Sequence, residues 1–311
     1  MPMKLTSVIA PCLVLLLCGT TQISLGQSQG DPTIEQAADL CRSGNLNQAL
    51  RAVDRAISAQ GQASGYAWFV KAFIHKEMFV QMDNLQTDSQ HRVAAVEAIR
   101  RSAAIGRAGS TVLDPGLETQ LDPLLAYLAQ TYLMDAQRSA SEVKPGEEPR
   151  ALRLFERYVQ AEAILNPGFR DRDTEVLLLQ NLAEHAMVAS RPEANPLGGD
   201  DEFELGVELY IRAAKAGPDA FTSWYNAAVH TYNRGVHLYR HGPDYDLAAE
   251  DRWHAVAASL WDRSRNLMWR AVDLRDQDPD VLHALSTVAE ALDHKADAAW
   301  CREHLHELQR N

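Results

Sequence analysis

The stretch Trp224–Thr231, which reads WYNAAVHT, carries the pattern that decides the fold. Its first, fourth, fifth and eighth residues share one face of an α-helix, because residues three and four apart are neighbours on a helix surface. The small side chain of Ala228 lets a second helix pack closely against this face. A second signal, Gly44–Leu50 (GNLNQAL), reads as a turn that leads into such a second helix. Together the two stretches predict antiparallel helix pairs.

The same spacing recurs along the chain, which predicts a repeat protein. Six approximate first helices have a small residue at the position of closest approach, namely Ala37, Ala72, Ala129, Ala183, Ala228 and Ser286. Six second helices follow, with matches that begin at Ala49, Ala95, Ala151, Gly206, Ser264 and Ala298. One pair cannot bury its apolar face alone, so neighbouring pairs must stack. We therefore expect an all-α solenoid of about a dozen helices. The alternative is a generic helical bundle with a heptad-like pattern.

The length of the repeats is predicted to vary along the chain. From the small residue to the start of the second-helix match there are 12 positions in the first copy (37 to 49) and in the last (286 to 298). The four inner copies need 23, 22, 23 and 36 positions. Eleven additional residues correspond to about three helical turns. The inner repeats are therefore expected to have longer helices, or to build a ridge or lid over one rim.

The pattern resembles the tetratricopeptide repeat (TPR) family, in which the first helix reads W-x2-L-G-x2-Y and the second reads A-x3-F. The resemblance is strongest in the first, fifth and sixth copies, and Pro218 precedes Trp224 at the spacing of the family's 34-residue repeat. The insertions in the inner copies depart from the family. The resemblance implies a right-handed superhelix that holds a protein or peptide partner in a concave groove, without a catalytic site or a cofactor.

The resemblance also implies which residues contact the partner. The family's groove positions fall, in the fifth copy, on Tyr225, Asn226, Val229, Tyr232 and Asn233. In the second copy they fall on Phe69, Val70, Phe73, Lys76 and Glu77. We predict partner contacts for the aromatic and amide side chains of this set: Tyr225, Asn226, Tyr232, Asn233, Phe69 and Phe73. Only Lys76 is available for the family's carboxylate clamp, which argues against a clamp. The alternative for the aromatic residues is packing against an elongated neighbouring helix.

Residues 1–26 have the order of an export signal. Lys4 precedes an apolar run at positions 8–17, and small residues end the segment at Gly26. We expect cleavage after Gly26, a mature domain at 27–311, and a bacterial protein of the periplasm or the extracellular space. The alternative, a lipid anchor at Cys18, is disfavoured by Leu17, where a lipobox has a small residue. No later segment has 18 uninterrupted apolar residues, so no span is expected in the mature chain.

Charge and missing motifs restrict the function further. The net charge of -12 excludes the basic footprint that binding to DNA or RNA requires. A phosphate-binding loop and a nucleophile elbow are both absent from the sequence. One alternative is a helical-toroid enzyme that acts on glycans, with Trp253, Trp261 and Trp269 as a platform. Another is a lipoprotein that binds sugars or peptides.

Three smaller patterns complete the sequence-based predictions. One continuous helix would place His230, His237 and His241 on one face, but Gly235 interrupts it, so they are only weak metal candidates and we expect no metal. Cys41 and Cys301 fall in the first and last copies, too far apart in a six-copy solenoid for a disulfide. The acidic run at 200–202 is expected to begin a helix, and neither this run nor the one at 276–278 is expected to bind calcium.

Overall fold

A computed structural model describes residues 32–59, 64–107, 113, 115–142, 146–191, 200–217, 220–241 and 247–310. These residues form twelve α-helices, and none of them lies in a β-strand. No helix in these ranges combines the length and the apolar character needed to cross a membrane. The predicted export signal at 1–26 and the alternative lipid anchor at Cys18 lie outside the described residues.

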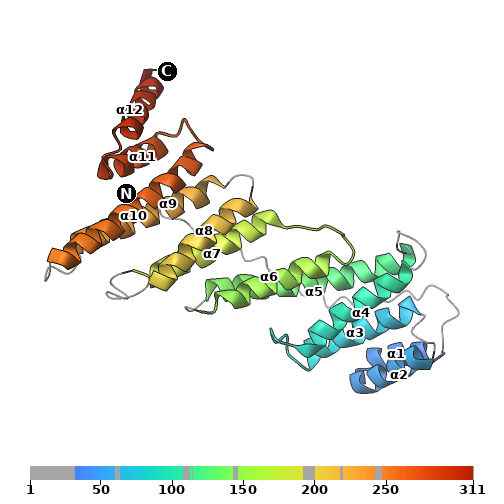
Figure 1. Cartoon of the computed structure of the whole chain (residues 1–311). Coiled ribbons are helices and arrows are strands. Elements are labelled where there is room, and N and C mark those ends of the chain that lie inside the picture. Colours follow the sequence, from blue (N-terminus) through green and yellow to red (C-terminus); the bar gives the residue numbers. More distant parts are fainter. Residues whose placement is uncertain are drawn as a thin grey trace.

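The helices follow one another as six antiparallel pairs (Figure 1). The pairs are α1 (Pro32–Arg42) with α2 (Leu46–Ala59), α3 (Gly65–Gln81) with α4 (Gln90–Gly106), α5 (Pro115–Ser141) with α6 (Glu148–Glu162), α7 (Arg172–Ala189) with α8 (Asp200–Ala216), α9 (Phe221–His241) with α10 (Leu247–Val272), and α11 (Pro279–Ala291) with α12 (Lys295–Arg310). The all-α solenoid predicted from the repeat spacing is therefore confirmed.

Helix lengths show where the additional residues of the inner repeats go. The first pair has helices of 11 and 14 residues, and the last pair has helices of 13 and 16. Helices of the four inner pairs contain between 15 and 27 residues. In the third and fifth pairs the insertions mostly lengthen the helices, whereas in the fourth pair most of the additional residues fall between the end of α7 at Ala189 and the start of α8 at Asp200.

Small residues bring the two helices of each pair together, as the sequence predicts. The alanines at the predicted close-approach position of the first five copies are fully buried, and Ser286 is buried in the sixth. Serines of the second helix add hydrogen bonds to the backbone of the first: Ser264 donates to the Ala228 carbonyl at 2.7 Å, and Ser102 donates to the Gly65 carbonyl at 2.7 Å. Apolar packing and these bonds together fix the register within a pair.

Gly235 does not interrupt α9, contrary to the sequence-based expectation. The helix runs through it, and the indole of Trp261 on α10 lies close to this point of the backbone. A Cβ atom at position 235 would come within 2.6 Å of the Trp261 indole nitrogen. The glycine therefore makes room for a bulky partner on the neighbouring helix.

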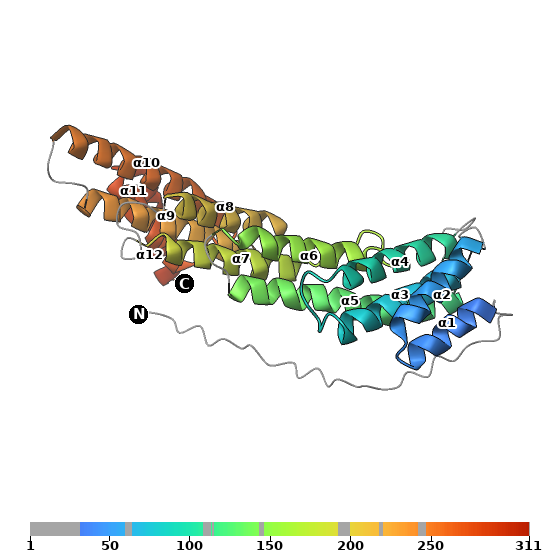
Figure 2. The same cartoon turned by 90° about the horizontal axis from the view of Figure 1, so that it is seen from below.

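The helices form two layers with different packing (Figure 2). First helices pack on one another at four junctions, namely α1–α3, α3–α5, α5–α7 and α9–α11. Among the described residues, no two second helices pack together to this extent. The first-helix layer, which contains the predicted groove positions, is thus the more continuous face of the stack.

The stack is open, because α1 and α12 lie at opposite ends of it in both views (Figures 1 and 2). Cys41 on α1 and Cys301 on α12 are free and buried, as predicted. Burial raises the pKa of each thiol to about 11, so neither is a reactive thiolate near neutral pH. The described helices do not close into the ring that the toroid alternative requires.

Candidate functional site

The first-helix layer opens at one junction, between α7 and α9. Both helices pack on α8, but in the described part of the chain they do not pack on each other as the other first helices do. Polar side chains bridge them instead, and we call this row of contacts the α7–α9 seam. Its contacts are Gln180 to Ser223 at 2.8 Å, Glu184 to His230 at 3.7 Å, and Arg234 to the Ser190 carbonyl at 3.4 Å.

A cavity of about 260 Å³ lies along the seam, and we call it the seam pocket. Three helices line it, with residues Met187, Ser190, Arg191, Phe203, His230, Asn233, Arg234 and His237. The floor is apolar, because Met187 and Phe203 are buried. Arg191 and Asn233 are exposed at the rim. Ligand pockets typically have about 300–1,000 Å³, so this volume suits one side chain or chain end of a larger partner.

A hydrogen-bonded network behind the pocket fixes the position of His230. The Tyr210 hydroxyl donates to Glu184 at 2.9 Å, and the rings of Tyr210 and His230 stack at 5.8 Å. The His230 imidazole is the main cause that holds the pKa of Glu184 at about 2. Burial and the Glu184 carboxylate raise the pKa of Tyr210, so the phenol stays a donor. Side chains held in this way are oriented before a ligand arrives.

The described residues that line the pocket carry hydrogen-bond donors, and none of them is a carboxylate. Two guanidinium groups, two imidazoles and one amide line the pocket. Two acids lie behind them: Glu184 beside His230, and Asp200, which accepts from Arg234 at 2.7 Å. Two of these donors, the guanidinium groups of Arg191 and Arg234, are cationic, in a chain with a net charge of -12. Such donors suit a carboxylate or another anionic group of a ligand.

Of the four predicted residues on α9, the structure brings Asn233 to the pocket. Tyr225 stacks on Phe221 at 5.7 Å, and Tyr232 lies 6.3 Å from the ring of Trp261. Asn226 hydrogen-bonds Tyr210 behind the pocket. These three side chains are half-buried in contacts within the protein, and the Tyr232 contact is with the neighbouring helix α10. Their contact with a partner stays a prediction for the parts that are exposed.

In the second copy, Phe69 was predicted to contact the partner, but the structure buries its side chain. Only 5% of Phe69 is exposed, so it belongs to the core and presents little surface to a partner. Phe73 is half-buried, and the Lys76 ammonium lies 5.2 Å from its ring and 5.3 Å from the ring of Tyr127. Lys76 also pairs with Glu77 at 2.6 Å. These contacts hold Lys76 against its own helix and against α5 of the next pair.

The three histidines proposed as weak metal ligands do not form a cluster. His230 and His237 both line the seam pocket, whereas His241 lies next to His237 with ring centroids 4.9 Å apart. Over the described ranges, no group of three or more His, Cys, Asp or Glu side chains is placed to hold a metal ion.

Two of the three tryptophans proposed as a platform, Trp261 and Trp269, pack within the fold. Trp261 covers Gly235, and Trp269 contacts Trp300 at 4.9 Å, which joins α10 to α12. The Trp269 indole N–H donates to Asp297 at 3.4 Å. Both rings are therefore occupied within the fold.

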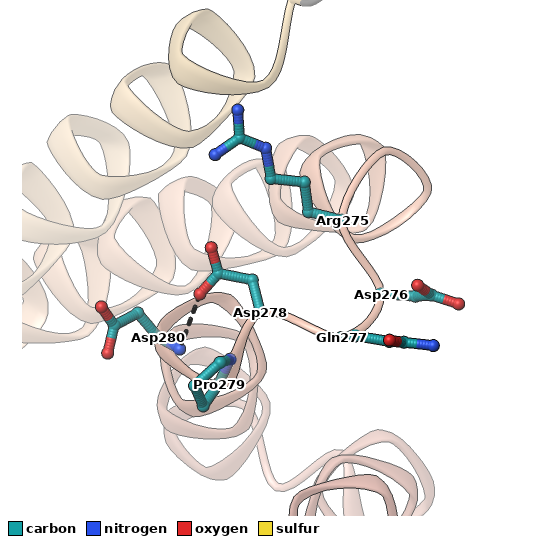
Figure 3. Close-up of a pocket in the computed structure, with 6 residues that line it drawn as sticks. All are labelled: Arg275, Asp276, Gln277, Asp278, Pro279 and Asp280. Carbon is teal, nitrogen blue, oxygen red and sulfur yellow. Dashed lines mark hydrogen bonds between the residues drawn. The ribbon is translucent and has the colours of Figure 1, made fainter. Parts of the chain in front are cut away.

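A larger hollow of about 540 Å³ lies over the turn between α10 and α11, lined by residues 275–280 (Figure 3). One of its acids has a structural role. Asp278 caps α11 and accepts the Asp280 backbone N–H at 3.0 Å. Arg275 lies 4.1 Å from the ring of Phe221. The hollow is thus formed by the turn itself, in which Asp278 and Arg275 make structural contacts.

Sequence reasoning missed Arg191, Arg234 and Phe203 as lining residues. Arg234 follows His230 by four positions, so the shared helix face was a usable signal. Arg191 follows the end of α7 and Phe203 lies on α8, so both meet α9 only in the folded chain.

No protein-family model and no curated protein matches the chain. Among solved structures, it is similar to the human IFIT1 dimer with PPP-AAAA. The identity is 13%, the match covers 90% of this chain and 72% of that chain, and the TM-score is 0.22. At this score the likeness carries no argument about the site.

Proposed function

We propose that this protein is an exported, non-catalytic, TPR-like scaffold that binds a protein or peptide partner along its first-helix face. The seam pocket is the observation that carries the proposal. It lies at the one junction of the described first-helix layer where neighbouring first helices do not pack directly on each other. The repeat register and the residues shared with the TPR pattern support the family assignment. The order of residues 1–26 supports export to the periplasm or the extracellular space.

An acidic side chain or a chain-terminal carboxylate of the partner fits the pocket chemistry. Arg191 and Asn233 stand at the rim, where they can meet an approaching anionic group. His230 and Arg234 lie on the same side of α9 as Asn233 and already have fixed partners. The rest of the partner would then lie along the neighbouring first helices.

Site-specific photo-crosslinking tests the location of the partner. A photoreactive amino acid replaces Asn233, and a matched control replaces Glu208, an exposed residue of α8 outside the pocket. We expect a discrete crosslinked partner from position 233 and none from position 208. Equal crosslinking from both positions would contradict the proposal.

A charge reversal tests the chemistry. Arg191→Glu should reduce this crosslink by about tenfold, because it replaces a donor with a repelling charge. Arg212→Glu, the same change at an exposed position of α8, should leave it unchanged. Export is tested separately by mass spectrometry of the protein. A chain that starts near Gln27 supports it, an intact Met1 contradicts it, and a lipid on Cys18 indicates the lipoprotein form.

A further inference from the structure

A groove between α4 and α6 lies in the second-helix layer, apart from the seam pocket. Two hollows of about 180 and 290 Å³ form it, and they are continuous because Arg100 and Gln160 line both. Their other lining residues are Val93, Val96, Glu97, Ala104, Arg107, Tyr132, Arg157, Ala161, Ala163 and Ile164. The groove exists because α4 and α6, within the described residues, do not pack on each other as the helices within a pair do.

The groove has an apolar floor. Val96, Tyr132, Ala161 and Ile164 are buried along it, and Tyr132 comes from α5, which lies beneath both helices. Val93 adds an apolar side chain that is 40% exposed. Small alanines on both helices leave room for side chains that enter from outside. A ligand for this floor must therefore present an apolar face.

The rim of the groove is basic. Arg100, Arg107 and Arg157 border it, and Glu97 is the one acid among its lining residues. Arg100 pairs with Glu97 at 2.8 Å, and Arg157 lies 5.9 Å from the ring of Tyr132. Arg100 and Arg157 are exposed, so their guanidinium groups are accessible to a ligand. This rim contrasts with the net charge of -12 of the whole chain.

We propose that the groove between α4 and α6 binds an acidic amphipathic segment of a partner protein. Leucine-type side chains of that segment would cover the apolar floor, and its carboxylates would pair with the three arginines, which suit carboxylates geometrically. A nucleic acid fits less well, because the floor offers aliphatic side chains instead of exposed stacking rings. The partner of the seam pocket would bind in the other layer, so the scaffold could connect two proteins.

The test uses a fluorescein-labelled peptide that forms a helix with leucines on one face and glutamates beside them. Fluorescence anisotropy should show binding to the full mature chain, and the binding should weaken as salt rises. Arg157→Glu should weaken it about tenfold, and Val93→Glu should weaken it by a similar factor, since both positions are exposed and line the groove. Arg212→Glu on α8 is the matched control and should bind as the unchanged protein does.

Four results would overturn the proposal. Two of them concern the acidic peptide: no binding to the unchanged protein, or equal binding to Arg157→Glu and Arg212→Glu. The other two are equally tight binding of a peptide with lysines in place of the glutamates, and displacement of the acidic peptide by a single-stranded RNA oligonucleotide. Crosslinking from position 233 does not depend on this groove, so a failure here leaves the proposal for the seam pocket standing.

Discussion

Histidines have opposite surroundings in the two halves of the molecule. In the second pair, His75 is 7% exposed, and its Nδ1 lies 3.1 Å from Nδ1 of His91. Burial lowers the pKa of His75 to about 4, which keeps the ring neutral. In the seam, His230 borders a cavity and holds the pKa of Glu184 at about 2. A polar contact that is buried on all sides, such as His75 with His91, can only stabilise the fold. A polar contact that borders a cavity, such as His230 with Glu184, can also interact with a ligand.

The N-terminal half of the molecule also contains a buried ion pair, between α4 and α5. Arg92 is fully buried and contacts Asp135 at 2.8 Å, which joins α4 to α5 across two pairs. The ring of Tyr132 lies 4.0 Å from its guanidinium, and that of Phe79 lies 5.1 Å from it. Both side chains are buried, so a ligand from solvent cannot take the place of either one. We therefore expect the largest loss of stability when this pair is disrupted.

The largest effect is expected for Asp135→Ala. Removing one partner of a buried pair leaves an uncompensated charge, which should cost about 3–5 kcal/mol of unfolding free energy. Urea denaturation followed by circular dichroism measures the loss. Asp122→Ala, at an exposed position of the same helix, is the control and should cost under about 0.5 kcal/mol. Equal costs for the two variants would show that the pair is not closed to water.

The next effect concerns the pH dependence of His75. Its folded pKa of about 4 lies below the ordinary value of 6.5, so the unfolded chain binds the proton first. The stability is fully present above about pH 6.5 and is lost as pH falls toward 4, by up to about 3 kcal/mol. Urea denaturation at several pH values measures the unfolding free energy, and His75→Leu should remove this part of its pH dependence between about pH 7 and about pH 4.5. If the unfolding free energies of the two proteins change with pH in parallel, His75 is in contact with water.

A third prediction contrasts two positions on α9. Ala228 is fully buried between α9 and α10, so Ala228→Leu should overpack the pair and cost about 1–3 kcal/mol. Asn233→Leu, at the rim of the seam pocket, should change stability by less than about 0.5 kcal/mol. Thermal denaturation of both variants measures this difference. If Asn233→Leu unfolds the protein as readily, the pocket rim belongs to the core.

The sequence predicts the repeat architecture because its signals are local. Small residues at fixed spacing identify both helices of each pair, and the uneven spacing predicts the longer inner helices. The acidic run at 200–202 lies in the first turn of α8, as its pattern predicts. Each of these features depends on residues within one or two helical turns, where periodicity and capping act.

The pocket was not predictable in the same way. It depends on α7 and α9 not packing directly, which is a property of three helices together. Gly235 was misread for a related reason, because its partner Trp261 lies on the next helix. Tyr232 and Phe69 match groove positions of the family, yet the elongated helices and the core cover much of their surface. Tertiary contacts therefore decided which matched positions remain exposed.

The smallest effect is expected for Glu184→Gln in the seam. The folded pKa of Glu184, about 2, lies below the ordinary value of 4.5, so its contribution is present above about pH 4.5 and is lost as pH falls toward 2. Because the carboxylate is half-exposed, water screens it, and the contribution should stay below about 1 kcal/mol. Urea denaturation at about pH 6 and about pH 2.5 measures it.

At the higher pH the unchanged protein should be slightly more stable than Glu184→Gln, and at the lower pH the two should agree. Glu208→Gln on α8 serves as the control and should show no such convergence. The same Glu184→Gln change removes the negative charge behind His230, so it should strengthen capture of an acidic partner at position 233. A loss of that capture would mean that Glu184 positions His230 for binding. The seam pocket would then depend on its hydrogen-bonded network, just as the buried Arg92–Asp135 pair depends on both of its partners.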